Sequence, residues 1–405
     1  MMNLTSKQDA LSVLYEIWDR PVKTETIDIE QCAGRILAED VYAASQIPVV
    51  RASGMDGIAV DSKAFYDEKG SFRMPDTSAW ELGKDYVRAD TGDDFPDEYD
   101  ATIAIEMVEL PENGKPLAIN LPEGMVIEPG TNVRTGGSSI KKDELLAASG
   151  RRINAETMAA LAMSGKRTFK VVKKPVVAFI PTGSELVTAG TELERGQNYN
   201  SNTFLVKTML EEMGAEALCM PIVKDKKNDL RAALEEALEK ADIVVINGGS
   251  SKGSEDFNTT LIKEMGTIIC HGVAAVPGRP MGIGLINDRP VVNLSGPTLA
   301  AFYGMDWCVR SLVCSLLGID YPVKPKVRAI LMEDLQTPPI MELCLRINLV
   351  KTPEGYEAWP VGHHGSQADM LATNGVYISS IGSDFLPAGT EIEVEVRGEL
   401  KTLSE

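Results

Sequence analysis

Two short loops rich in glycine and hydroxyl residues each follow a run of apolar, mostly β-branched residues. Residues 176–180 lead into 181–186 (Pro-Thr-Gly-Ser-Glu-Leu), and residues 243–247 lead into 248–256 (Gly-Gly-Ser-Ser-Lys-Gly-Ser-Glu-Asp). Continuous apolar runs of this length are typical of strands buried on both faces of a parallel sheet. Loops at the carboxyl ends of such strands bind ligands, and their backbone N–H groups favour anions. The two loops therefore predict a site for a small, oxygen-rich anion.

The residue types in these loops suit a phosphate or another oxyanion. The expected ligand-binding residues are Thr182, Gly183, Ser184, Gly248, Gly249, Ser250, Ser251, Lys252 and Ser254. Arg279, between two prolines, is a further candidate because a guanidinium binds oxyanions through two donors. The alternatives stay open at this point: glycines also serve plain turns, and Lys252 or Arg279 can be exposed basic side chains.

Three carboxylates are candidates for a cation site. Asp56 follows a flexible Gly-Met pair, Glu185 lies in the first loop, and Asp256 ends the second loop. Magnesium is usually held by one or two carboxylates together with water and substrate oxygens. The alternative for Asp56 is an aspartate that caps its own turn.

Composition and charge narrow the class of protein. The chain has 405 residues, so two to four domains are expected, and no apolar run is long enough to span a membrane. A formal net charge of −19 argues against nucleic acid as a partner. Six scattered cysteines without a CxxC pair and only three histidines predict neither a disulfide framework nor a His-rich metal site. We expect a protein of the reducing cytoplasm.

The order of predicted elements indicates a multi-domain α/β protein. Strands and helices alternate from 175 to 322, which predicts a doubly wound, mostly parallel sheet. We expect an N-terminal helix (1–26) packing with that domain, a helical linker domain (27–45 and 146–174), an inserted β-rich domain (46–145), the α/β ligand-binding domain (175–322) and a small C-terminal β domain (323–405).

Capping residues and apolar spacing predict individual helices. Ser6, Asn154 and Asp225 are the expected caps of helices over 6–20, from 155 onward and over 228–240. A helical pattern is also expected from about 143, and one long apolar helix from about 298 to 317.

Other catalytic classes lack support. Ser366 lies near His363 and His364, but no GxSxG nucleophile elbow is present. Neither a P-loop nor a GxGxxG motif after a strand occurs, so an ordinary NTPase or Rossmann dehydrogenase is not indicated.

Nine motifs in order along the chain resemble the MoeA/gephyrin E-domain family of molybdopterin molybdenumtransferases. They are residues 32–40, 54–60, 91–92 with 100–106, 132–137, 181–186, 200–202, 248–253, 277–281 and 365–375. These are similar to the family's segments GRxLAxD, SMDGYAV, TG…ADAVV…E, NVRxxGED, STGDEL, DSN, GGVSVG, PGKPL and SGxL…ANG. The resemblance covers about residues 7–398.

The resemblance implies a function for the site. Such enzymes insert molybdate into adenylylated molybdopterin and release AMP, using Mg²⁺, and they work as homodimers with contact to a molybdopterin adenylyltransferase. It assigns Asp56, Glu185 and Asp256 as catalytic residues and metal ligands. It also adds Thr91, Arg134, Ser201, Asn202 and Ser366 to the substrate-binding residues; for Arg134, a salt bridge is an equal alternative.

Four positions depart from the family pattern. Ser138, Ser139, Ser184 and Ser254 stand where the family carries acidic residues. The losses favour a second hypothesis, a non-catalytic paralogue that binds molybdopterin or a related anion as a carrier or scaffold. A third hypothesis is a related transferase that uses another oxyanion, such as tungstate.

Overall fold

The computed structural model describes residues 4–248, 257–361, 367–398 and 401–402. The chain forms two compact units. Residues 1–25 and 172–405 belong to the first unit, and residues 26–171 belong to the second. The second unit is therefore an insertion into the first.

A six-stranded sheet is the centre of the first unit. Its strands are β12 (Val176–Pro181), β15 (Glu216–Cys219), β16 (Ile243–Asn247), β17 (Thr267–His271), β19 (Gly282–Ile286) and β20 (Arg289–Leu294), in the order β15-β12-β16-β20-β19-β17. Strands β15, β12, β16 and β20 are parallel, and β19 runs antiparallel to both of its neighbours. The carboxyl ends of β12 and β16 are thus adjacent, with Pro181 opposite Asn247.

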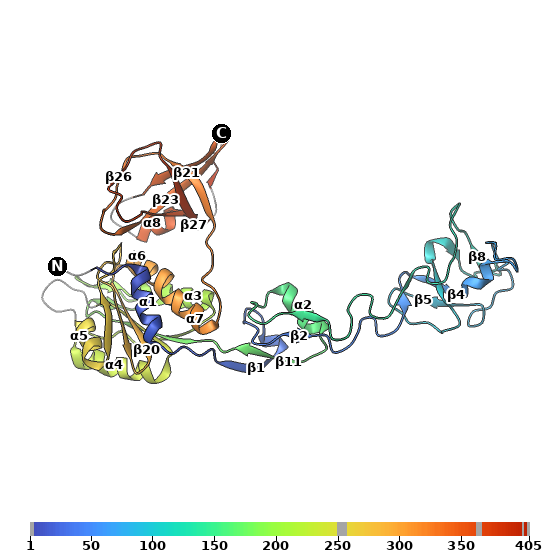
Figure 1. The fold of residues 1–405 in the computed structure, drawn as a ribbon, viewed down its shortest axis with the longest axis horizontal. Coiled ribbons are helices and arrows are strands. Elements are labelled where there is room, and N and C mark those ends of the chain that lie inside the picture. Colours follow the sequence, from blue (N-terminus) through green and yellow to red (C-terminus); the bar gives the residue numbers. More distant parts are fainter. Residues whose placement is uncertain (1–3, 249–256, 362–366, 399–400, 403–405) are drawn as a thin grey trace. The chain divides into compact units, whose positions relative to one another are not determined.

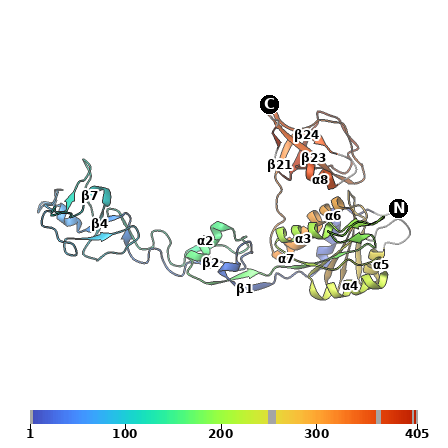
Figure 2. The same cartoon turned by 180° about the vertical axis from the view of Figure 1, so that it is seen from behind.

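Helices cover both faces of this sheet (Figures 1 and 2). They are α1 (Lys7–Ile17), α3 (Asn202–Met213), α4 (Lys227–Lys240), α5 (Phe257–Met265), α6 (Thr298–Gly304) and α7 (Arg310–Leu317). Leucines at helical spacing in α4 pack with α5 side chains on Ala178, Ile180 and Val244 in one core. On the other face α3 contacts α6 and α7. This confirms the doubly wound, mostly parallel sheet.

Several local expectations are confirmed and two are wrong. Ser6 caps α1 by accepting the Asp9 N–H at 3.0 Å, and Asn154 caps α2 (Ala155–Met163). The expected single helix over 298–317 contains a π-helical turn, η4 (Met305–Val309), between α6 and α7. The helix expected to begin near 143 is instead strand β10 (Leu145–Ala147), which pairs with β2 (Val41–Tyr42).

The C-terminal β domain has its own core. Its elements are β21 (Lys326–Leu331), β22 (Leu335–Gln336), β23 (Glu342–Thr352), β24 (Gly355–Pro360), α8 (Gln367–Ala372), β25 (Gly375–Ile378), β26 (Phe385–Leu386), β27 (Glu391–Val396) and β28 (Lys401–Thr402). Alternate residues of these strands, including Leu331, Ile347 and Val394, form one buried cluster. Strand β18 (Ala275–Val276) of the α/β domain pairs with β23.

The second unit is rich in short strands. Besides β2, β10 and α2 it contains β3 (Ala52–Ser53), β4 (Gly57–Val60), β5 (Tyr86–Ala89), β6 (Ala101–Ala104), β7 (Val108–Glu109), β8 (Ala118–Ile119), β9 (Val133–Arg134) and short 3₁₀ turns at 29–31, 62–65 and 105–107. Strands β1 (Thr24–Asp28) and β11 (Thr168–Val172) form a two-stranded ribbon across the boundary of the units. An inserted β-rich part is thus confirmed, and the finer domain boundaries stay predictions.

Candidate functional site

The two glycine loops begin side by side, with Gly248 against Thr182. Gly248 has φ +119, and a Cβ there would lie 2.2 Å from the Thr182 carbonyl oxygen. The Thr182 N–H donates to the Asn247 carbonyl at 2.8 Å, one residue before Gly248. Only glycine tolerates both this φ and this approach. The register of β12 and β16 therefore brings together the two loops expected to bind one ligand.

Buried asparagines fix the floor of this site. Asn202, at the start of α3, donates from Nδ2 to Asn247 Oδ1 at 2.7 Å and to the Gly296 carbonyl at 2.8 Å. Asn247 in turn donates to the Ser295 carbonyl at 2.8 Å. Asn202 Oδ1 and Ser295 Oγ are buried without a hydrogen-bond partner among the described residues. Buried polar atoms are nearly always paired, and of these two residues Asn202 also lines a pocket that the loops border.

A second amide pair lies behind the first. Asn258 of α5 donates to the Gly248 carbonyl and to Asn293 Oδ1, both at 2.8 Å. Asn258 and Asn293 are each 1% exposed. Sequence reasoning missed Asn247, Asn258 and Asn293. The signal was present for two of them, since Asn247 and Asn293 are polar residues at the carboxyl ends of continuous apolar runs.

These loops border a pocket of about 650 Å³. It is lined by Thr182, Glu185, Leu186, Leu193, Asn198, Tyr199, Asn200, Ser201, Asn202, Asn247, Gly248, Gly296, Pro297 and Thr298. Strands β13 (Leu186–Val187) and β14 (Asn198–Tyr199) pair in one wall. Ser201 Oγ lies 3.4 Å from Thr298 Oγ1, which joins the first turns of α3 and α6. Five residues expected from sequence thus line one pocket: Thr182, Glu185, Ser201, Asn202 and Gly248.

Ser184 has an acidic neighbour. Its N–H donates to Asp225 Oδ2 at 3.0 Å, and the Asp225 N–H donates back to Ser184 Oγ at 3.3 Å. Sequence reasoning took Asp225 for the N-cap of the helix beginning near 228. That assignment is wrong, because the N-cap of α4 is Lys226, which makes no side-chain capping bond. The carboxylate of Asp225 instead lies at the first glycine loop. Gly183 beside it donates its N–H to the Val223 carbonyl at 3.0 Å.

Several expected residues lie elsewhere. Arg279 is exposed and is not among the residues that line the pocket, although the adjacent Gly278 approaches the Ala300 carbonyl of α6. Its role stays a prediction. The following candidates lie outside the described residues: Gly249, Ser250, Ser251, Lys252, Ser254, Asp256 and Ser366.

The second unit gathers the remaining candidates into a separate cluster. The Thr91 N–H donates to Asp56 Oδ1 at 2.6 Å, and this bond lowers the pKa of Asp56. Arg134, in β9, lies close to the Gly54 position two residues before Asp56. All three side chains are exposed. Asp56 is thus an ionised, accessible carboxylate held by a backbone donor, as one expects of a residue that receives a cation or a polar substrate.

The metal site stays a prediction. No group of three His, Cys, Asp or Glu residues close enough to hold a metal occurs in the part of the chain that the structure describes. Magnesium needs only one or two protein carboxylates when substrate phosphates supply the rest. Exposed Glu185, whose carboxylate leans over Gly183, and Asp225 offer carboxylates at the first loop.

Comparison with known proteins decides the family. Residues 5–165 match the MoeA N-terminal region (domain I and II), and residues 178–313 match the probable molybdopterin binding domain. The molybdopterin molybdenumtransferase of Bacillus subtilis is 31% identical over 383 residues, which cover 91% of this chain and 87% of that protein. This chain belongs to the MoeA family of molybdopterin molybdenumtransferases.

Further relatives agree with this membership. The molybdopterin molybdenumtransferase of Haemophilus influenzae is 29% identical over 78% of each chain. A crystal structure of a molybdopterin biosynthesis MoeA protein from Pyrococcus horikoshii superposes with a TM-score of 0.78 at 29% identity, covering 98% of this chain and all of that one. None of the described helices is long and apolar enough to cross a membrane.

Proposed function

We propose that this chain inserts molybdate into adenylylated molybdopterin and releases AMP. The observation that carries the proposal is the joint between the two glycine loops, where Gly248 lies on Thr182 beside a pocket of about 650 Å³. A pocket of this size is within the range of small-molecule sites and is large enough for a pterin joined to a nucleotide. Family membership indicates the class of reaction, a molybdenum transfer, and the pocket is where we propose that the substrate binds.

The chemistry of the pocket wall suits a ligand with many oxygens. Its lining includes the hydroxyl residues Thr182, Ser201 and Thr298 and the amide residue Asn198. Helix α3 begins at the pocket, and the first turn of a helix favours a negative charge. Local donors are needed because the chain as a whole carries a formal net charge of −19 and repels anions.

A rigid pocket floor also explains how such a site could position its substrate. The buried amide of Asn202 donates to Asn247 Oδ1 and to the Gly296 carbonyl group. The buried amide of Asn247 donates to the Ser295 carbonyl group, so the floor is held in place before the substrate arrives. In this proposal the loops hold the phosphates and place the dithiolene next to molybdate, so catalysis is mainly positioning and electrostatic stabilisation.

Magnesium, the dimer and the cellular location belong to the same proposal. Glu185, Asp256 and Asp56 would hold Mg²⁺, which would neutralise phosphate charge. A homodimer would let the Asp56–Thr91 cluster of one subunit meet the pocket of the other. Substrate would be bound by Thr91, Arg134, Arg279, Ser366 and residues 249–254. We further propose a cytoplasmic enzyme that receives its substrate from a molybdopterin adenylyltransferase.

The non-catalytic alternative rests on serine at four positions where acids are expected. The contact between Ser184 and Asp225 favours the enzyme, because it returns a carboxylate to the first loop. Incubating the purified chain with adenylylated molybdopterin, Mg²⁺ and molybdate separates the two. Release of AMP together with active cofactor supports the enzyme, whereas tight binding without AMP release supports the carrier. Competition between molybdate and tungstate in the same assay tests the third hypothesis.

A further inference from the structure

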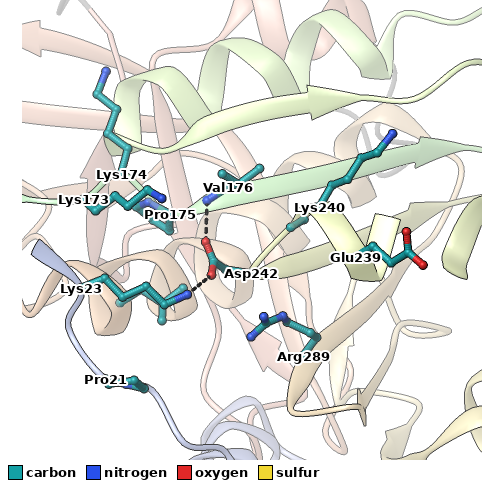
Figure 3. Close-up of a pocket in the computed structure, with 12 residues that line it drawn as sticks. Pro21, Lys23, Lys173, Lys174, Pro175, Val176, Glu239, Lys240, Asp242 and Arg289 are labelled. Carbon is teal, nitrogen blue, oxygen red and sulfur yellow. Dashed lines mark hydrogen bonds and ion pairs between the residues drawn. The ribbon is translucent and has the colours of Figure 1, made fainter. Parts of the chain in front are cut away.

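A second pocket opens at the opposite end of the α/β sheet, where strands β12 and β16 begin. Its volume is about 220 Å³. It is lined by Pro21, Lys23, Lys173, Lys174, Pro175, Val176, Glu239, Lys240, Ala241, Asp242, Arg289 and Leu316 (Figure 3). Five of these residues are cationic and two are acidic. This excess of positive charge is local, because the chain as a whole is strongly acidic.

Asp242 neutralises one of the cations. Its carboxylate accepts from Lys23 Nζ at 2.8 Å and from the Val176 N–H at 3.0 Å. Figure 3 shows both bonds meeting at this carboxylate. Burial raises the pKa of Asp242, but the bonds from Lys23 and Val176 and the nearby charge of Arg289 outweigh it and lower the pKa. Asp242 therefore stays ionised and holds Lys23 in the wall of the pocket.

Arg289, like Lys173 and Lys174, has no fixed side-chain partner among the described residues, although its charge acts on Asp242. It is half-buried at the first residue of β20, and within the described ranges its guanidinium makes no hydrogen bond or ion pair. Lys240 differs, since it pairs with Glu236 at 2.6 Å. Lys173 and Lys174, on the segment between β11 and β12, are exposed and add two more charges. A half-buried arginine is suited to a phosphate, which accepts from two guanidinium donors at once.

We propose that this pocket binds a small, multiply charged phosphate anion. Its volume is below the roughly 300 Å³ at which sites for drug-sized ligands begin, so it fits a compact anion rather than a pterin nucleotide. In this arrangement Arg289 holds the anion, and Lys173 and Lys174 attract it. The apolar surfaces of Pro21, Pro175 and Leu316 border the anion and exclude water.

The pocket is separate from the site between the glycine loops. Thr182 there is six residues beyond Val176 here, which corresponds to roughly 20 Å along β12. Arg289 and Ser295 are likewise at opposite ends of β20. A phosphate bound at one site therefore does not touch the residues of the other, and mutations can distinguish the two.

The test uses inorganic pyrophosphate and isothermal titration of the full-length protein without pterin substrate. We expect saturable binding with a Kd below about 1 mM. Arg289→Ala and the double variant Lys173→Ala/Lys174→Ala should each weaken it at least tenfold, and Arg289→Lys should weaken it by a smaller factor. Lys207→Ala on α3 is the matched control and should leave the affinity within twofold, whereas Arg279→Ala reports on pyrophosphate bound near the glycine loops instead. Melting temperatures of all variants verify folding.

Three outcomes overturn the proposal. Equal weakening by Lys207→Ala and Lys173→Ala/Lys174→Ala means diffuse attraction to surface lysines. Loss of binding in Arg279→Ala but not in Arg289→Ala places the anion near the glycine loops, which leaves the proposed function intact and rejects this second site. If pyrophosphate does not bind at all, the proposal is wrong.

Discussion

Gly248 lies directly on the carbonyl group of Thr182, so closely that a β-carbon on Gly248 would come within 2.2 Å of that oxygen. Gly248→Ala should therefore force the two loops apart. The new methyl group would be strained by the positive φ, and its overlap with the Thr182 carbonyl should lower the unfolding free energy by about 1–3 kcal/mol more. We expect a lower melting temperature and loss of AMP release.

Gly355→Ala is the matched control for this change. Gly355 also has a positive φ, +143, but open space surrounds its missing Cβ. It should show backbone strain with normal activity of the folded protein. Equal activity of the two variants would contradict the role of the joint.

The asparagine pair gives a second prediction. Asn202→Ala removes the Nδ2 group that donates to Asn247 Oδ1 and to the Gly296 carbonyl. Leaving buried acceptors unpaired costs about 1–3 kcal/mol, and the pocket floor should loosen. Urea denaturation should give a lower unfolding free energy, and kinetics should give a higher KM. Asn120→Ala, which breaks one exposed bond to Glu109, should change stability by less than about 0.5 kcal/mol. A stable Asn202→Ala protein with unchanged KM would reject this role.

The charge of Asp225 at the first loop can be removed while its hydrogen bond to Ser184 is kept. Asp225→Asn keeps an oxygen that accepts the Ser184 N–H but removes the charge. If Asp225 replaces the acid missing at Ser184, AMP release should fall at least tenfold (about 1.4 kcal/mol) at unchanged melting temperature. Asp229→Asn in the first turn of α4 is the control and should remain active. Full activity of Asp225→Asn would mean that this charge has no part in the reaction.

A buried ion cluster makes stability depend on pH. Asp306 of the π-helical turn pairs with Arg310 and Lys324 and accepts from Arg397 beyond β27 at 2.7 Å. Burial raises the pKa of Asp306, but Arg397 and Lys324 outweigh it and lower the pKa. Because the pKa of Asp306 is lower in the folded protein than in the unfolded chain, its ionisation stabilises the fold. This stabilisation is fully present above the unfolded-chain pKa of about 3.9 and is lost as pH falls through the pKa of the folded protein.

Asp306→Asn tests this cluster directly. Removing the anion leaves cations buried without their partner, which costs about 3–5 kcal/mol. Unfolding curves between about pH 7 and pH 2 should show a large deficit at neutral pH that narrows in acid. Asp320→Asn changes an exposed carboxylate, and its unfolding free energy should depend on pH as that of the unaltered protein does. A deficit that stays constant with pH would contradict the electrostatic account.

Sequence reasoning succeeded where local pattern determines structure. The apolar runs before Thr182 and Gly248 gave strands β12 and β16 to within one residue, and Ser6 and Asn154 were recognised as caps. Each of these depends on neighbours in sequence, which is the information that periodicity and capping rules use.

Distant partners explain the failures. Leu145 and Leu146 look helical, but the pairing of Leu145 with Tyr42 and of Ala147 with Val41 makes a strand. Asp225 has the composition of a cap and instead binds Ser184, 41 residues away. The amide pairs that fix the pocket floor likewise join residues from separate strands and helices, so no local pattern reveals them.

We propose that molybdate insertion takes place in the pocket that Thr182 and Gly248 line. The most direct measurement follows AMP and metal-loaded cofactor together, with the purified chain, adenylylated molybdopterin, Mg²⁺ and molybdate. We predict that AMP and active cofactor form in equal amounts over many turnovers and that Gly248→Ala abolishes both. Substrate that binds tightly but yields no AMP would contradict the account.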